Sequence, residues 1–189
     1  MHLLWIGAHP DDELFVAPYL GAMRERGARI DFLLATRGEQ GPCYRPEGCE
    51  PDLGTVRERE MRDAGGADPL RARFVRGIEA FAPEEILTLD PEHSGHADHR
   101  AVGRLVLSLG LAMPVTLAES RPTWRAPMSI LPAVENATAF DARAHWQWLV
   151  RDLECHRSQM RPETIDAFAS VAEDERKVWL LRRIPNVLA

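Results

Sequence analysis

The fold is decided by residues 3–36, which read LLWIGAHPDDELFVAPYLGAMRERGARIDFLLAT. Residues 3–8 form a short apolar run that is typical of a buried strand. Residues 11–26 carry apolar side chains at helical spacing and are followed by Gly27, and residues 29–36 form a second apolar run. A strand, a helix and a strand in so short a stretch predict a βαβ unit with parallel strands.

The rest of the chain continues this alternation of strands and helices. We expect further strands at residues 85–89, 114–118 and 129–134, and further helices at residues 55–64, 74–81, 99–109, 141–157 and 163–172. Thr55 is the predicted cap of the first of these helices. No repeat or linker divides the sequence. We therefore predict one domain over residues 1–189 of the α/β class, a Rossmann-like three-layer α/β/α fold with a mainly parallel sheet.

The composition limits the partners of the protein. The chain has 45% apolar and 28% charged residues and a formal net charge of −6, which is the profile of a soluble globular protein. An acidic surface disfavours binding to nucleic acids and to anionic membranes. The sequence shows neither a membrane-spanning run nor a basic leader, so we expect a cytoplasmic protein. It leaves the formation of homo-oligomers open.

Residues 37–54 lack periodicity and are rich in glycine and proline. A long loop after the second strand is typical of a functional lid, because open α/β sheets bind ligands at the carboxyl ends of their strands. This loop holds Cys43 and Cys49, and Cys155 lies near the C-terminus. Three cysteines are too few for a disulfide framework, so we expect free thiols. A local bridge or a second metal site in the loop is the alternative.

Two clusters of polar residues carry the chemistry, and each follows a predicted strand. In the first cluster, HPDDE at residues 9–13, His9 and Asp12 are three residues apart, so both side chains can reach one ion. In the second cluster, His96 and His99 have the same spacing. Two imidazoles and one carboxylate suit zinc or a similar divalent ion. The sequence therefore predicts a metal site with polar groups left over for proton transfer.

These clusters resemble the two signature motifs of the PIG-L/LmbE-like zinc-dependent de-N-acetylases, which remove acetyl groups from N-acetylglucosamine conjugates. The resemblance rests on AHPDDE at residues 8–13 and HADH at residues 96–99, and it spans roughly residues 3–160. Further matching stretches are TRGEQG at residues 36–41, RERE at residues 57–60 and HRSQ at residues 156–159.

The resemblance assigns roles to individual residues. It implies that His9, Asp12 and His99 are the metal ligands and that Asp11 is the general base. It implies that a protonated His96 stabilises the oxyanion. The implied ion is Zn²⁺, one per chain, with Fe²⁺ or another divalent ion as the alternative.

Three further residues complete the predicted site. Arg57 matches an arginine that binds substrate in the family, and Glu39 is predicted to be a neighbouring substrate-binding or lid residue. Asp98 is predicted to orient or charge His96, with a role as a helix cap as the alternative. We interpret the remaining histidines as structural or exposed: His2, His93, His145 and His156.

The predicted function is amide hydrolysis that releases acetate and a free amine from an N-acetylglucosamine-type sugar conjugate. Ala97 stands where the second motif usually has proline, and the chain is shorter than many family members, which leaves the substrate open. The alternatives are a non-catalytic metal- or sugar-binding domain and an amidase for a non-sugar substrate. A dinucleotide site is excluded, because the turn after the first strand lacks the Gly-x-Gly-x-x-Gly spacing.

Overall fold

The computed structural model describes residues 1–39, 41–45, 48, 53–63, 74–94, 96–118 and 138–184. Its centre is a six-stranded sheet with the strand order β2-β1-β3-β4-β6-β5. The strands are β1 (His2–Gly7), β2 (Arg29–Leu34), β3 (Glu85–Leu89), β4 (Val115–Ala118), β5 (Thr138–Asp141) and β6 (Lys177–Ile184). The first four strands in this order are parallel, and β6 is antiparallel to both of its neighbours. The predicted α/β fold with a mainly parallel sheet is confirmed.

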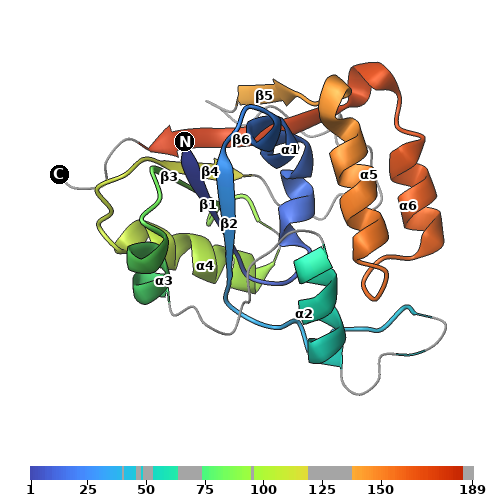
Figure 1. Cartoon of the computed structure of the whole chain (residues 1–189), viewed down its shortest axis with the longest axis horizontal. Helices are drawn as coiled ribbons and strands as arrows, with labels where there is room; N and C mark the ends of the chain where they lie inside the picture. Colours follow the sequence, from blue (N-terminus) through green and yellow to red (C-terminus); the bar gives the residue numbers. More distant parts are fainter. Residues whose placement is uncertain are drawn as a thin grey trace.

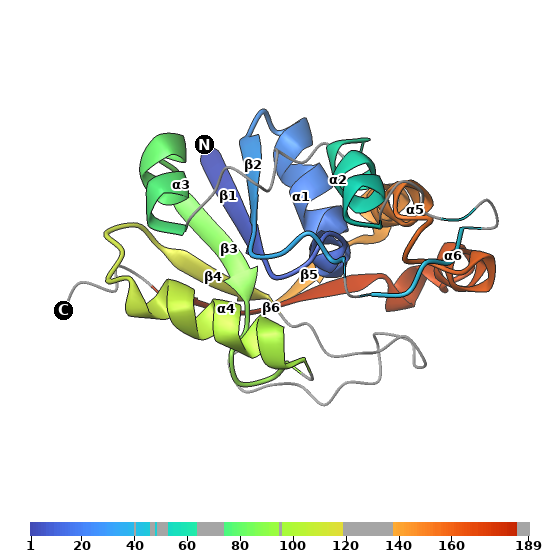
Figure 2. The same cartoon turned by 90° about the horizontal axis from the view of Figure 1, so that it is seen from below.

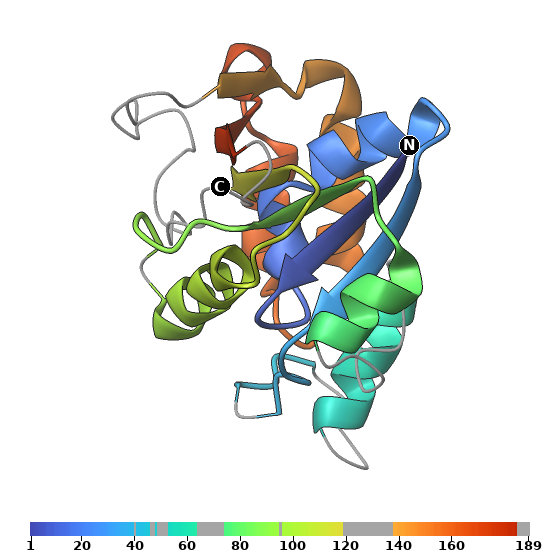
Figure 3. The ribbon, with the colours of Figure 1, turned by 90° about the vertical axis from the view of Figure 1, so that its left-hand side faces the viewer.

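Helices cover both faces of this sheet. They are η1 (Asp12–Phe15), α1 (Ala17–Glu25), α2 (Leu53–Asp63), α3 (Phe74–Phe81), α4 (Ala97–Ser108), η4 (Arg143–His145), α5 (Trp146–Cys155), α6 (Pro162–Ala169) and η5 (Glu173–Glu175). α1 and α5 pack together on one face, whereas α3 and α4 lie on the other (Figure 1, Figure 3). The two middle parallel strands, β1 and β3, are therefore buried on both sides, which explains their continuous apolar sequences.

The helix predicted at residues 11–26 is broken into η1 and α1 at Val16. Pro18 lies in the first turn of α1. In a continuous helix it would lie in the interior, where its ring would clash with the carbonyl group of Leu14. The break leaves Asp11 and Asp12 at the end of β1, in a short 3₁₀ segment and the turn before it.

β5 and β6 were not predicted from the sequence. Figure 2 shows β6 (red) beside β4, where it extends the parallel sheet with an antiparallel strand. The sequence of β6, KVWLLRRI, has an apolar middle and no alternation, so it gives no strand period. The helix predicted at residues 141–157 begins later, at Trp146, because Asp141 ends β5.

Other local predictions need correction or lie outside the described residues. Thr55 does not cap α2 but lies inside it, and its Oγ1 accepts a hydrogen bond from Arg37 at 3.3 Å. Cys43 is disulfide-bonded, so the expectation of a free thiol there was wrong, whereas Cys155 remains a thiol. Cysteine number alone does not show which side chains lie close enough to pair. Cys49 and the strand predicted at residues 129–134 lie outside the described residues.

Among the helices that the structure describes, none has the length and apolar character needed to cross a membrane.

Candidate active site

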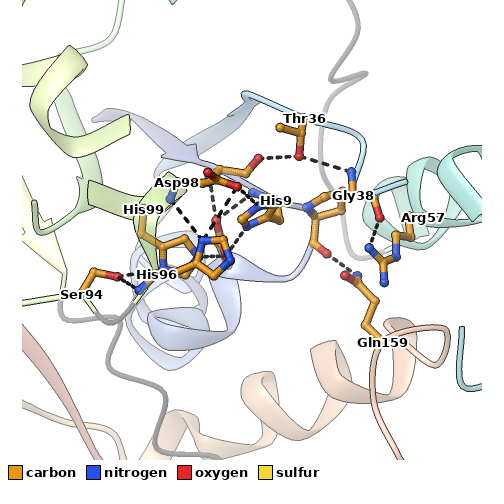
Figure 4. A network of polar contacts seen from close by, with 12 residues as sticks. His9, Thr36, Gly38, Arg57, Ser94, His96, Asp98, His99 and Gln159 are labelled. Atoms are coloured by element: carbon orange, nitrogen blue, oxygen red, sulfur yellow. Dashed lines mark hydrogen bonds and ion pairs between the residues drawn. The ribbon is translucent and has the colours of Figure 1, made fainter. Parts of the chain in front are cut away.

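The two predicted clusters meet at the carboxyl ends of β1 and β3, which pair in parallel (Figure 4). His9 follows β1, and His99 lies in the first turn of α4, which follows β3. One ligand atom from each of His9, His96 and His99 lies within 4.8 Å of the other two. The fold therefore brings together two motifs that are far apart in the sequence.

The two histidines of the predicted ligand set each turn one nitrogen toward Asp12. His9 Nε2 lies 3.0 Å from Asp98 Oδ2, and its Nδ1 lies 3.6 Å from Asp12 Oδ1. His99 Nδ1 lies 3.1 Å from Ser94 Oγ, and its Nε2 lies 2.9 Å from Asp12 Oδ1. An outer partner of this kind fixes the ring and directs the other nitrogen inward, as it does at histidine-ligated metals.

Asp12 is held in the same way. Its Oδ2 accepts hydrogen bonds from the backbone N–H groups of Ala8 at 2.6 Å and His9 at 2.8 Å, which leaves Oδ1 to face both imidazoles. Gly7 makes this approach possible, because a Cβ atom there would lie only 3.3 Å from Asp12 Cβ and 2.9 Å from Trp5 Nε1. Two imidazole nitrogens and one carboxylate oxygen therefore converge, a donor set that suits a divalent cation such as zinc.

The charged groups in this cluster shift one another's pKa values. Burial opposes ionisation of Asp12, but hydrogen bonds from His9 and His99 outweigh it and lower the pKa of this carboxyl group. Burial lowers the pKa of His9, but its contacts with Asp12 and Asp98 outweigh burial and raise the pKa to about 9. Metal binding needs a neutral imidazole, so loading the site releases a proton.

Asp11 is the one strained residue of the cluster. Its φ of 138° is unusual for a residue with a side chain, and its carboxylate lines the pocket. Burial, and next the negative charge of Asp12, raise the pKa of Asp11 to about 8. A carboxyl group with this pKa can both accept and release a proton near neutral pH.

His96 is the N-cap of α4, and its Nδ1 accepts a hydrogen bond from the backbone N–H of Asp98 at 3.2 Å. Burial, together with the positive charges of His99 and His9, lowers the pKa of His96. The structure thus favours a neutral His96, and not the protonated form expected from the resemblance. Because Nδ1 accepts, the proton of the neutral ring lies on Nε2, from which it can be donated.

Asp98 lies closer to His9 than to His96. Its Oδ2 is 3.0 Å from His9 Nε2 and 3.9 Å from His96 Nδ1. The sequence predicted a partnership with His96, because spacing along one helix shows neighbours only within that helix. In the structure the carboxylate of Asp98 instead supports a predicted metal ligand.

These residues line a pocket of about 720 Å³, which also contains Glu39 and Arg57. Arg57 is only 4% exposed; its Nη1 donates to the carbonyl oxygen of Gly38 and its Nη2 to that of Pro42, the latter at 2.8 Å. A Cβ atom on Gly41 would collide with this guanidinium group. Arg57 therefore holds the loop that forms one wall, and substrate binding by Arg57 and Glu39 stays a prediction.

Sequence reasoning missed four residues of the site: Ser94, Tyr44, Gln159 and Arg161. Arg161 lies at the pocket rim with its guanidinium carbon 4.9 Å from the centre of the Tyr44 ring. Gln159 belongs to the HRSQ stretch, which was the only sequence signal for any of the four. The others follow no spacing rule, because they come from loops that meet only in the fold.

Comparison with known proteins shows which proteins this chain resembles. Residues 4–76 match the model of the family described as PIG-L: GlcNAc-PI de-N-acetylase. A curated relative, the probable N-acetyl-alpha-D-glucosaminyl L-malate deacetylase 2 of Bacillus cereus, is 26% identical over 145 residues. That alignment covers 64% of this chain and 64% of the relative.

Solved structures share the fold at lower identity. The N,N'-diacetylchitobiose deacetylase from Pyrococcus horikoshii is 16% identical with a TM-score of 0.70, over 97% of this chain and 84% of that one. GalB, the 4-carboxy-2-hydroxymuconate hydratase from Pseudomonas putida KT2440, is 17% identical with a TM-score of 0.62, over 90% of this chain and 84% of that one. At these identities the likeness establishes the fold alone, and the names of the two proteins show that this fold carries more than one reaction. The family match over residues 4–76, the curated relative and the shared fold together confirm the resemblance of this chain to the PIG-L/LmbE-like family.

Proposed function

We propose that the protein is a metal-dependent hydrolase that removes the acetyl group from an N-acetylglucosamine-type sugar conjugate. The observation that carries this proposal is the convergence of His9 Nδ1, Asp12 Oδ1 and His99 Nε2 in the pocket that also holds Asp11. A site that only bound a metal would have no use for a carboxylate on a strained backbone beside its ligands. The family match and the deacetylase name of the Bacillus cereus relative support the same reaction.

His9, Asp12 and His99 are the proposed ligands of one Zn²⁺ ion, with Fe²⁺ or another divalent ion as the alternative. When bound, such an ion supplies Lewis-acid chemistry: it lowers the pKa of water and polarises a carbonyl group. His96 lies within reach of the same cluster and is the alternative third imidazole.

Asp11 is the proposed general base. A carboxylate oxygen of Asp11 takes a proton from the water molecule that attacks the acetamide carbonyl carbon. The same carboxyl group then gives this proton to the sugar nitrogen as the C–N bond breaks. The products are acetate and a free amine, and Asp11 returns to its starting state.

His96 is the proposed donor to the carbonyl oxygen as negative charge develops on it. Its Nδ1 is occupied by the Asp98 N–H, so the Nε2–H group is available for this hydrogen bond. A donor that already points at the developing charge stabilises the transition state more than the substrate. Asp98 assists through His9, which it orients.

The pocket has the size expected for a sugar-sized ligand. Glu39 and Arg57 are the proposed substrate-binding residues in its walls. An amide of a non-sugar compound is the second candidate substrate, since GalB shows that the fold is not limited to deacetylases.

A metal analysis paired with an activity screen tests this function. The purified protein is loaded with Zn²⁺ or Fe²⁺, its metal content is measured, and amine and acetate release are followed across N-acetylglucosamine derivatives and non-sugar N-acetyl amides. We expect about one ion per chain and release of both products from the sugar derivatives. A metal-loaded protein that releases neither product from any sugar derivative would contradict the proposal.

A further inference from the structure

The backbone of Asp11 is held in a conformation that it would not adopt by itself. Its φ of 138° and ψ of −9° lie in the region that favours glycine. Such strain persists only where surrounding contacts impose it. The Asp11 carbonyl oxygen accepts a hydrogen bond from the N–H of Leu14 at 3.1 Å, which restrains the peptide after Asp11. A different contact must restrain the peptide before it.

Gln159 supplies that contact from the segment after α5 (Figure 4). Its side-chain Nε2 donates a hydrogen bond to the carbonyl oxygen of Pro10. This carbonyl group and the N–H of Asp11 belong to one planar peptide unit. A hydrogen bond to Pro10 O therefore fixes the orientation of this peptide plane, and the φ angle of Asp11 follows from that orientation.

The amide of Gln159 is itself oriented by a buried pair. Its Nε2 lies 3.2 Å from His156 Nδ1, and His156 Nε2 contacts Glu13 Oε1. Both members of this pair are buried, His156 being 0% and Glu13 1% exposed. Because Pro10 O can only accept, the nitrogen of the Gln159 amide must face it, and the same nitrogen lies against the buried His156 ring. Glu13 lies in η1, so the contacts lead back to the loop that contains Asp11.

We propose that Gln159 is a positioning residue that holds the Pro10–Asp11 peptide and thereby aims the Asp11 carboxylate into the pocket. His156 and Glu13 keep the Gln159 amide in the orientation that this requires. The role of Gln159 in turnover rests on the proposed function, whereas its role in the backbone geometry of Asp11 does not.

The test uses the full chain with its metal loaded and a variant that removes the donor without emptying the space. Gln159→Met keeps the length of the side chain, and Gln147→Met, at an exposed position of α5, is the matched control. We expect the φ of Asp11 to leave the positive region in a crystal structure of Gln159→Met, with metal content unchanged. We expect kcat to fall about 10- to 100-fold and KM to stay within about twofold, because a misplaced base slows chemistry without weakening binding.

A second variant covers the case in which Gln159→Met does not fold. Gln159→Glu has nearly the same shape, but its carboxylate cannot donate to Pro10 O, so the same change in Asp11 is expected. A positive φ retained at Asp11 in the folded variants would overturn the proposal. So would a rise in KM at unchanged kcat, which would make Gln159 a substrate contact. If the wild type hydrolyses no N-acetyl compound, the proposed function fails, and the φ of Asp11 still decides the positioning role.

Discussion

His9 and Asp98, 89 residues apart in the sequence, are joined by a contact of 3.0 Å between Nε2 and Oδ2. The contact links the end of β1 to the first turn of α4. It also distinguishes the two nitrogens of His9, since Nε2 lies within hydrogen-bond distance of Asp98, whereas Nδ1 lies 3.6 Å from Asp12 and is the proposed ligand atom.

Removing this contact should weaken metal binding without unfolding the protein. We expect Asp98→Ala to lower the affinity for Zn²⁺ about 10- to 100-fold, as loss of an outer partner of a ligand typically does. Competition with a chelator of known affinity measures the effect. Glu79→Ala, at an exposed position of α3, is the control, and equal affinity of the two variants would refute the role of Asp98.

Asp11 and His99 should separate metal binding from catalysis. We expect Asp11→Asn to keep the metal and to lose about 100-fold or more in kcat, because it can no longer accept a proton. His99→Ala should lose both metal and activity, since it removes a ligand. Metal content and acetate release are measured on the same samples, and full activity of Asp11→Asn would exclude Asp11 as the base.

Replacing Arg57 should lower the stability of the protein, in addition to any effect on substrate binding. Lysine cannot span the carbonyl oxygens of Gly38 and Pro42, which Arg57 bonds through separate nitrogens. We expect Arg57→Lys to reduce the free energy of unfolding by about 1–3 kcal/mol, because buried carbonyl groups lose a partner. Arg59→Lys, at an exposed position of the same helix, should change little. Urea denaturation of both variants makes the comparison.

Asp152 should make stability depend on pH. Burial, and next the charge of Glu13, raise the pKa of Asp152 from its usual value of 3.8 to about 7. A raised folded-state pKa means that the group favours the folded state fully below its unfolded pKa, and that this contribution is lost as the pH rises toward the folded pKa. We therefore expect stability to fall between about pH 4 and pH 7 through this group.

Asp152→Asn removes the titration and should flatten that fall, so that the variant gains stability relative to the wild type as the pH rises. Asp166→Asn, at an exposed position of α6, is the control. Thermal unfolding of the three proteins from pH 4 to pH 8 measures the difference. If the stability of the wild type and of Asp152→Asn changed with pH in parallel, Asp152 would not be the cause of the fall in stability.

The sequence predicted the parallel part of the sheet because its middle strands, β1 and β3, are buried on both faces and therefore read as apolar runs. It did not predict β5 or β6, because the four residues of β5 are too few to show a period and the sequence of β6 does not alternate. The proposed metal ligands could be inferred from two short motifs. Ser94 and Gln159 could not, since their partners, His99 and Pro10, are brought to them only by the fold.

The partner of His156 also could not be predicted from the sequence. It was interpreted only as structural or exposed, and the structure shows it fully buried against Glu13. A histidine and a glutamate 143 residues apart give no joint signal in one sequence.

Arg57 holds the backbone of its loop through two hydrogen bonds, so the shape of this pocket wall and the side chains that face the pocket can change independently. Arg57 bonds the backbone carbonyl groups of Gly38 and Pro42, which every residue type offers, so these two anchor points do not depend on most of the side chains nearby. The nearby side chains of Glu39 and Tyr44 can therefore be exchanged while the wall keeps its course. Substrate preference can then diverge between relatives, or be redesigned, by changing side chains that face the pocket on an unaltered frame.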